Sequence, residues 1–416
     1  MKILVLNSGS SSLKFQLFEL FSVTQNSYQL LASGLIEKIA EAHSRVTLDY
    51  IDSYKQNKKY QQKINISNHA QALELMISLL KDKHCISSMK ELKGIGHRIV
   101  HGGEQFKQAV IINQQVIKHI EQLIPLAPLH NPANLSGIKL AQEKAADIPQ
   151  VAVFDTSFHQ TIPQYAYIYA LPYHLYEQHH IRRYGFHGTS HHYVAKQADH
   201  YLQQSAATAE APKPLKLITI HLGNGASACA INNGQSVDTS MGMTPLEGLV
   251  MGTRSGNIDP AILFYLQQKT AMTLTQINDM LNQKSGLKGI CGDNDMRNII
   301  SRAEQGNHQA ELAIHIFCYH IKKYIGAYLA VLNGADAIIF TGGIGENSAL
   351  IRDYICQDMH HLGINIHADK NHQKNSNILE IQNTDSKIKI LVIHTNEELE
   401  IAQQTALLVE KITRCN

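Results

Sequence analysis

The sequence contains a glycine turn between two apolar runs, a pattern that can hold phosphate oxygens. Residues 217–220 alternate as a buried strand does, Gly223-Asn224-Gly225 follows closely, and residues 226–231 form a second apolar run. Backbone N–H groups in such a turn can bind phosphate, and His221 and Asn224 could add side-chain donors. The alternative is an ordinary hairpin in which the glycines serve only the turn.

Two further side chains could stabilise charge on a transferred phosphoryl group. Arg254 is flanked by glycines within residues 252–256, and its guanidinium suits developing phosphoryl charge. His187 also has glycines nearby and could donate a hydrogen bond into a cleft. His187 and His191 have the spacing of two metal ligands on a helix, but no Glu follows His187 and no Cys is near, which disfavours zinc.

Arg98 and Asp155 could serve a small carboxylate ligand. Arg98 lies inside an apolar run closed by glycines at residues 94–103, and an inward-facing arginine must be paired. Its partner is either a carboxylate ligand or an internal Asp or Glu. Asp155 ends an apolar strand over residues 149–155, where functional groups of α/β sheets gather. The alternative for Asp155 is a helix cap.

The start of the chain repeats the strand, turn and strand arrangement. Residues 3–6 predict a strand, residues 7–12 a small polar turn flanked by Asn7 and Lys14, and residues 13–17 a second strand. Two such arrangements indicate a duplicated fold whose two lobes would face each other across a central cleft.

A third glycine turn follows the apolar strand over residues 335–340. Gly343 and Gly345 partly match a dinucleotide fingerprint, but Ser348 replaces the third glycine. No Gly-x4-Gly-Lys-Ser/Thr loop occurs. A nucleotide would therefore be held by several separate turns, which is the arrangement of the actin-like ATPases.

The remaining patterns predict an α/β protein. We expect helices within residues 67–92, 115–124, 133–144, 258–282, 299–303, 310–333, 348–359 and 399–412, and a strand over 388–393. Residues 365–388 predict an edge hairpin or loop, and residues 203–214 an exposed loop. The composition changes near residue 155, so we expect an N-terminal lobe of residues 1–155 and a C-terminal lobe of residues 156–395.

Composition excludes several classes of protein. The 416 residues contain 37 Lys and Arg against 35 Asp and Glu, so the net charge of +2 argues against nucleic acid or membrane as a main partner. The six cysteines are scattered and the chain starts directly as a strand, so we expect a reduced, cytoplasmic protein.

Ten sequence blocks resemble the acetate kinase (acetokinase) family of the actin-like ATPase superfamily. They occur in the family's order and span nearly the whole chain: NSGSSSLKF, GHRIVHGG, LAPLHNP, VFDTSFH, RRYGFHGTSH, HLGNGAS, MTPLEG, MGTRSGNIDP, FTGGIGENS and TNEELEIA. The resemblance implies transfer of the ATP γ-phosphate to acetate, giving acetyl phosphate and ADP, with Mg²⁺ (Mn²⁺ as an alternative). It also implies a homodimer, with nucleotide binding and dimerisation in the C-terminal lobe, and a C-terminal helix of residues 396–416 that returns to the N-terminal lobe.

The same resemblance implies a role for each matching residue. Asp155, His187 and Arg254 would be catalytic, and Asn7 and Glu397 would place the metal. Arg98 would bind the acetate carboxylate, and the rest of the acetate site would be formed by Val100, Leu129, Pro245 and His130. ATP would be bound by Lys14, His221, Leu222, Gly223, Asn224, Gly225, Asp295, Met296, Arg297, Gly343, Ile344, Gly345, Glu346 and Asn347. Asn257, where the family often has Asp, and Lys288 and Cys291 depart from the pattern and leave nucleotide preference open.

Three other functions compete with this one. A propionate or butyrate kinase of the same family would differ at the acyl pocket, where Val100 is the discriminating residue. A non-catalytic nucleotide-gated binding protein on the same fold would not need Arg98 beside an apolar pocket. A nicotinamide dehydrogenase using residues 343–348 lacks an early dinucleotide unit.

Overall fold

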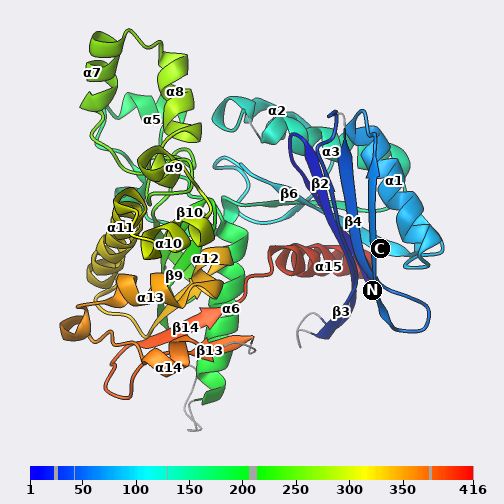
Figure 1. Cartoon of the computed structure of the whole chain (residues 1–416). Helices are drawn as coiled ribbons and strands as arrows, with labels where there is room; N and C mark the ends of the chain where they lie inside the picture. Colours follow the sequence, from blue (N-terminus) through cyan, green and yellow to red (C-terminus); the bar gives the residue numbers. More distant parts are fainter. Residues whose placement is uncertain (23–26, 42, 129, 206–212, 374–376, 416) are drawn as a thin grey trace. The chain divides into compact units, whose positions relative to one another are not determined.

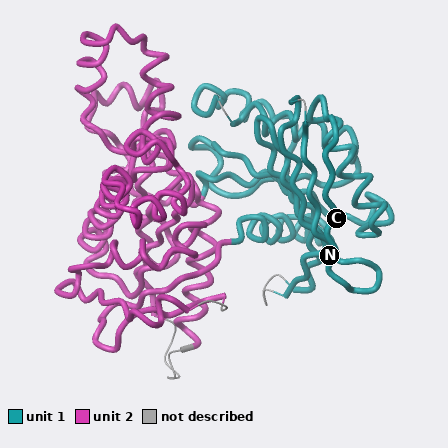
Figure 2. Tube along the Cα trace, viewed as in Figure 1, with its two compact units in different colours: residues 1–157, 396–416 teal, residues 158–395 magenta. Residues whose placement is uncertain are grey.

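A computed structural model describes residues 1–416 except 23–26, 42, 129, 206–212, 374–376 and 416 (Figure 1). The chain divides into two compact units (Figure 2). Unit 1 consists of residues 1–157 and 396–416, and unit 2 of residues 158–395. In the described ranges, no helix is both long enough and apolar enough to span a bilayer.

Unit 1 is built on an eight-stranded mixed sheet in the order β5-β4-β3-β2-β1-β6-β8-β7. The first five strands of the chain form an antiparallel meander, β6 and β8 run parallel to β1, and β7 pairs antiparallel with β8. The strands are β1 (Lys2–Ser8), β2 (Ser12–Ser22), β3 (Ser27–Glu37), β4 (Ser44–Ile51), β5 (Asn57–Ile64), β6 (Leu92–Ile99), β7 (Val110–Ile111) and β8 (Gln150–Phe154).

Helices pack on both faces of this sheet because alternate strand residues point to opposite sides. In β1, Leu4 and Leu6 belong to the core that includes Met76 of α1, whereas Ile3 and Thr405 of α15 both border Gly94. The helices of unit 1 are α1 (His69–Asp82), α2 (Gln114–Gln122), α3 (Asn131–Lys144) and α15 (Glu397–Cys415), with short 3₁₀ turns at Met89–Glu91 and Ile124–Leu126.

Unit 2 is built on a six-stranded mixed sheet in the order β11-β10-β9-β12-β14-β13. Helix α6 packs against β9, β12 and β14, and α11 packs against β10. The strands are β9 (Lys216–Leu222), β10 (Ala226–Asn232), β11 (Gln235–Thr239), β12 (Ala337–Thr341), β13 (Ile378–Glu380) and β14 (Lys389–Ile393).

The helices of unit 2 outnumber its strands, and several are short. They are α4 (Gln164–Tyr167), α5 (His174–His179), α6 (Gly188–Ser205), α7 (Ala261–Thr270), α8 (Leu274–Gln283), α9 (Gly286–Cys291), α10 (Met296–Glu304), α11 (His308–Leu332), α12 (Gly342–Asn347), α13 (Ala349–Cys356) and α14 (Ala368–Asn371), with a 3₁₀ turn at His360–Leu362. A further 3₁₀ turn, Ser157–Thr161, starts in unit 1 and ends in unit 2.

The two sheets repeat one topology. The order β3-β2-β1-β6-β8-β7 in unit 1 corresponds strand by strand to β11-β10-β9-β12-β14-β13 in unit 2. In each, the first three strands are antiparallel, the next two run parallel to the first, and an antiparallel edge strand closes the series. This repeat confirms the α/β class and the duplicated fold.

The structure also corrects the prediction of a third glycine turn. Residues 342–347 form the short helix α12, and α13 starts only at Ala349. The Glu346 carboxylate explains the change, because it accepts hydrogen bonds from the N–H of Gly342 at 2.9 Å and from the Thr341 hydroxyl at 3.3 Å. These bonds satisfy donors at the start of α12 that a simple turn would leave to a ligand.

Candidate active site

Arg98, near the end of β6, is held by carboxylates within unit 1. Its Nη2 lies 2.6 Å from Asp155 Oδ2, its Nε donates to both Asp155 oxygens at 3.1 and 3.2 Å, and Glu397 Oε2 lies 3.8 Å from Nε. Burial acts to lower the pKa of Arg98. The negative charges of Asp155 and Glu397 outweigh burial, so the pKa of Arg98 lies above its usual value. Of the two alternatives that the sequence allowed for the partner of Arg98, the internal carboxylate is therefore present.

One end of the Arg98 guanidinium remains available. Among the described residues, no hydrogen bond engages Nη1 of Arg98. The side chain is 21% exposed, so this nitrogen can donate to a small carboxylate while Asp155 holds the other edge. Asp155 and Arg98 meet because β8 and β6 are parallel neighbours whose carboxyl ends coincide.

Two buried asparagines of α3 fix the strand ends next to Arg98. Asn134 accepts from the N–H of Val100 at 3.1 Å and donates to the carbonyl of Ser8 at 2.8 Å. Asn131 accepts from the N–H of His101 and donates to its carbonyl, both at 3.2 Å. Helix α3 therefore holds the segment after β6 and the end of β1 in one place. Sequence reasoning missed both residues, although their i, i+3 spacing after a proline-rich loop was a usable signal.

The other predicted residues of unit 1 lie on neighbouring elements. Asn7 is near the end of β1 and pairs across the strands with Lys14 of β2. Lys14 forms an ion pair with Glu398 at 2.5 Å, and Glu397 starts α15. His130 directly precedes α3. Leu129 lies outside the described residues.

In unit 2, the predicted phosphate turn lies between β9 and β10. Gly223 donates to the carbonyl of Gly225 at 2.9 Å, and the carbonyl of Asn224 accepts from the N–H of Gly252 at 2.9 Å. A Cβ at Gly252 would overlap Asn224 Oδ1, so the glycine permits the close approach of the Arg254 loop to this turn.

Arg254 differs from Arg98 because none of the described acidic residues pairs with it. Its Nη1 donates to the carbonyl of Pro245 at 3.3 Å and contacts Met251 Sδ at 4.0 Å. Among the described residues no carboxylate forms an ion pair with it. Partial burial lowers the pKa of Arg254. A half-buried cation without a counter-ion is a site for an anionic ligand.

His187 and Arg254 meet at Gly225. A Cβ placed at Gly225 would lie 3.3 Å from His187 Nε2 and 3.8 Å from Arg254 Nη1. His187 has φ of +55°, the left-handed region that a residue with a side chain rarely occupies. It directly precedes α6, and its carbonyl accepts from the N–H of His191 at 2.9 Å. The ring of His221 lies beside it, tilted by 33°, with ring centroids 4.5 Å apart.

The zinc alternative for His187 and His191 does not match the contacts. Both ring nitrogens of the buried His191 are occupied by hydroxyls at 2.8 Å, Thr219 on Nδ1 and Ser227 on Nε2. A metal ligand needs one of these nitrogens for the ion.

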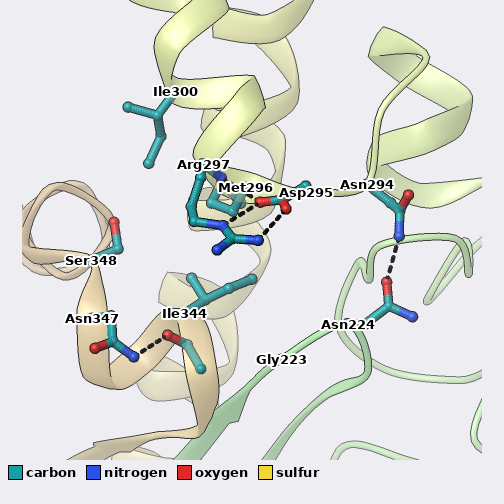
Figure 3. A pocket seen from close by; sticks show the side chains of 11 residues that line it. Gly223, Asn224, Asn294, Asp295, Met296, Arg297, Ile300, Ile344, Asn347 and Ser348 are labelled. Atoms are coloured by element: carbon teal, nitrogen blue, oxygen red, sulfur yellow. Dashed lines mark hydrogen bonds and ion pairs between the residues drawn. The ribbon is translucent and has the colours of Figure 1, made fainter. Parts of the chain in front are cut away.

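A pocket of about 820 Å³ lies beside the phosphate turn in unit 2 (Figure 3). This volume is typical of a small-molecule site. Its walls are formed by the β9–β10 turn, by α10 and the two residues before it, and by α12 and the residue after it. They combine polar and apolar side chains. The lining residues are Gly223, Asn224, Asn294, Asp295, Met296, Arg297, Ile300, Gly343, Ile344, Asn347 and Ser348.

Most of the predicted nucleotide residues of unit 2 line this pocket or its turn, and three of them serve the frame. Leu222 is fully buried and Gly345 packs beside it. Glu346 accepts from the N–H of Thr395 at 3.0 Å and lies 2.7 Å from His394 Nδ1, which joins α12 to the segment after β14. Asn294, Ile300 and Ser348 line the pocket but were missed, because each is an ordinary residue next to a recognisable motif.

Arg297 and Asp295 form an ion pair in the lining of the pocket (Figure 3). Arg297 donates to both carboxylate oxygens, at 2.9 and 2.5 Å, and Asp295 also caps α10 by accepting from the N–H of Arg297. The side-chain hydrogen bond from Arg297 lowers the pKa of Asp295 to about 2.

Comparisons with known proteins agree with this geometry. A family model described as the acetokinase family matches residues 2–403. The acetate kinase of Sulfurovum sp. (strain NBC37-1) is 51% identical over 414 residues, which cover 99% of this chain and 100% of that protein. The chain belongs to the acetokinase family.

Two solved structures are similar to this chain over nearly its whole length. The crystal structure of Porphyromonas gingivalis acetate kinase is similar with a TM-score of 0.89 and 41% identity, and covers 98% of this chain and 99% of that chain. A propionate kinase from Francisella tularensis subsp. tularensis SCHU S4 is similar with a TM-score of 0.88 and 43% identity. The match again covers 98% of this chain and 99% of that chain.

The donor chemistry of unit 1 fits the magnesium ion that the acetokinase resemblance implies. Asn7 and Glu397 carry oxygen donors, which Mg²⁺ prefers, and Mg²⁺ commonly takes only one or two protein ligands. Among the described residues, no hydrogen bond engages the half-buried side chain of Asn7. An amide without a protein partner at a strand end is suited to an ion or its water.

Proposed function

We propose that this chain is an acetate kinase that reversibly transfers the γ-phosphoryl group of ATP to acetate, giving acetyl phosphate and ADP. The observation that carries the proposal is the pairing of His187 with Arg254 at Gly225. Arg254 lacks an acidic partner among the described residues, and the adjoining 820 Å³ pocket matches a nucleoside in size. Family membership and relatives named acetate kinase support the same activity.

In this proposal, unit 2 binds the nucleotide. The base and ribose would contact the walls formed by Met296, Ile344 and Asn347, and the phosphates would extend toward the turn at residues 223–225. His187 and Arg254 would then donate to the oxygens of the phosphoryl group in transfer. Such donors stabilise charge that grows in the transition state.

Unit 1 would bind the acid. Arg98 Nη1 would take the acetate carboxylate, with Val100 and His130 near its methyl group. An acetate oxygen is already ionised at neutral pH because its pKa is about 4–5. No general base is needed, so Asp155 would hold Arg98 in place, as its three contacts with that side chain suggest.

Asn7 and Glu397 would hold Mg²⁺, or Mn²⁺, directly or through water. When bound, the ion would neutralise phosphate charge. Lys14 would supply further positive charge to the phosphates, and it would have to share that role with its ion pair to Glu398.

The chain would act as a cytoplasmic homodimer. Exposed apolar side chains on α7 and α8 support a protein partner: Phe264 is 66% exposed, Tyr265 61% and Leu274 70%. Light scattering should give about 93 kDa for a dimer of the 46.4-kDa chain, and Phe264→Glu should shift the mass toward the monomer. A wild-type mass near that of one chain would refute the dimer.

A hydroxamate assay tests the activity directly. Hydroxylamine converts an acyl phosphate into a hydroxamate and releases phosphate, so the product reports on the acid that was phosphorylated. We expect product with acetate only when ATP and Mg²⁺ are both present. No product with acetate, propionate or butyrate would overturn the proposal and favour a non-catalytic nucleotide-binding protein. Higher kcat/KM with propionate would favour a propionate kinase, the activity named for the similar Francisella protein.

A further inference from the structure

Behind His187 lies a hydrogen-bonded chain of side chains in unit 2. Ser227 Oγ lies 2.8 Å from His187 Nδ1 and 2.8 Å from His191 Nε2, and Thr219 Oγ1 lies 2.8 Å from His191 Nδ1. Thr219, His191 and Ser227 are each 0% exposed. The proposed reaction assigns no role to any of these three residues.

The fold accounts for this alignment. His187 and His191 are four residues apart at the start of α6, so they lie on one side of the helix. Thr219 of β9 is two residues from His221, which faces Ser227 of β10 across the strands. All three strand residues therefore point to the same face of the sheet. Because α6 packs on β9, the hydroxyls lie between the two imidazoles and the strands.

The protons in this chain have two possible directions. In the first, Thr219 donates to His191 Nδ1, His191 Nε2–H donates to Ser227, and Ser227 donates to His187 Nδ1. In the second, every hydrogen bond is reversed and His187 carries its proton on Nδ1. Burial holds the pKa of His191 well below its usual value, so His191 is neutral and has a single N–H to donate.

The far end of the chain selects the first direction. The Thr219 hydroxyl has no other hydrogen-bonding partner among the described residues. If His191 donated to it, the Thr219 hydroxyl proton would be buried without an acceptor, which costs about 1–3 kcal/mol. If Thr219 donates instead, each proton between Thr219 and His187 has an acceptor.

We infer that Thr219, His191 and Ser227 are positioning residues that hold His187 as the Nε2–H tautomer, with this N–H directed to the phosphoryl group in transfer. Nε2 faces the Gly225 turn: together with Cε1 it lies 3.3 Å from a Cβ placed at Gly225, whereas Nδ1 contacts Ser227. A neutral imidazole in the other tautomer would present a lone pair there, which repels phosphate oxygens. The tautomer follows from the geometry alone. That the N–H is directed to a phosphoryl group rests on the proposed function.

The tautomer can be measured without activity. Two-bond ¹H–¹⁵N spectra of histidine-labelled, substrate-free protein identify which ring nitrogen is protonated, and His187→Gln assigns the signal. We expect Nε2–H in the wild type. Ser227→Ala and Thr219→Val should each give a mixture of tautomers. The Thr219 variant is the sharper test, because the Thr219 hydroxyl is linked to His187 through His191 and Ser227, and a merely local structural role would not alter the distant ring.

Kinetics provide the second readout. Ser227→Ala should lower kcat about ten- to hundredfold, while KM for ATP and acetate changes little. This decrease in kcat should be smaller than the decrease caused by removing the His187 side chain. Ser227→Thr should restore both the tautomer and kcat. Ser236→Ala is the matched control, because it removes an equally buried serine hydroxyl. Ser236 contacts His159 at 2.9 Å and is not part of the hydrogen-bonded series from Thr219 to His187. It should change neither quantity.

The outcomes separate the two proposals. An Nδ1–H tautomer in the wild type, or an unchanged tautomer and kcat in both Ser227→Ala and Thr219→Val, would overturn the inference. If Ser227→Ala does not fold, Thr219→Val carries the test, because it replaces the hydroxyl with a methyl of similar shape. A wild type with the Nε2–H tautomer that forms no acyl phosphate would overturn the proposed function and support the tautomer assignment.

Discussion

Arg98 and Arg254 differ in what surrounds their guanidinium groups. Arg98 shares two hydrogen-bonding nitrogens with Asp155 and leaves Nη1 available, whereas Arg254 has a backbone carbonyl and a sulfur as its contacts. A paired arginine suits permanent recognition of one carboxylate, because its charge is already balanced. An arginine without a counter-ion suits charge that appears only during transfer.

Arg254→Ala should therefore act on turnover. We expect kcat to fall about 10²–10³-fold, because one donor to the transition state is lost, with little change in KM for acetate. Steady-state kinetics with varied acetate and ATP measure both constants. Arg302→Ala is the control, since Arg302 also donates to a backbone carbonyl of unit 2, that of Cys291 at 2.9 Å. Full turnover in Arg254→Ala would refute the role.

Arg98→Ala should act mainly on acetate binding. We expect KM for acetate to rise at least tenfold, because a bidentate or charge-assisted contact to a carboxylate is worth about 1.5–3 kcal/mol. The variant also removes the guanidinium that contacts the buried Asp155 carboxylate, so its stability should fall. Adding Asp155→Asn should recover part of that stability, measured by urea unfolding, without restoring KM. Recovery of KM in the double variant would contradict direct binding by Arg98.

At the scale of elements, the site depends on how closely loops approach one another. The Arg254 loop reaches the β9–β10 turn because Gly252 has no side chain, and α3 fixes two strand ends through Asn131 and Asn134. None of these contacts involves a proposed substrate directly. They determine where the phosphate and carboxylate donors lie.

Gly252→Ala tests the closest of these approaches. The new methyl group would overlap Asn224 Oδ1, so the turn must move, and we expect KM for ATP to rise while kcat falls. Gly326→Ala in α11 is the control, because nothing lies within 4 Å of the added methyl. Alanine there should leave kinetics unchanged and stabilise the helix by up to about 1 kcal/mol. Equal nucleotide affinity in Gly252→Ala and wild type would contradict the close-packing argument.

At the scale of the whole molecule, buried neutral histidines should make the protein sensitive to acid. Burial lowers the pKa of His97, His101 and His159 to about 4 each. In the unfolded chain these groups bind protons below about pH 6.5. Their contribution to stability is therefore complete above that pH, and is lost progressively as the pH falls from about 6.5 to about 4.

We expect each of these histidines to cost about 1 kcal/mol of stability by pH 5.5. Urea unfolding midpoints at pH 7.5 and pH 5.5 measure the loss. His97→Gln should reduce the difference between the two midpoints, because a glutamine can still donate to Gln150 and cannot take up a proton. His200→Gln is the control at an exposed position. A midpoint independent of pH over this range would contradict the burial argument.

The sequence predicted the main strands and helices around the site, and it missed others for physical reasons. Strands β3 to β5 were not predicted, since β5 is largely exposed and polar (Asn57–Ile64) and carries little apolar alternation. The glycines of residues 342–347 predict a turn where α12 forms, because the cap from Glu346 depends on a side chain that points backward along the helix.

By itself the sequence determined the family, the duplicated α/β fold and the groups able to bind phosphate and carboxylate, because these are encoded in short local blocks. Only the tertiary structure decided which of those groups are already paired. Arg98 with Asp155, Lys14 with Glu398, and His187 with Ser227 join residues between 40 and 384 positions apart. Spacing along the chain does not specify such contacts; strand register and helix packing bring them together.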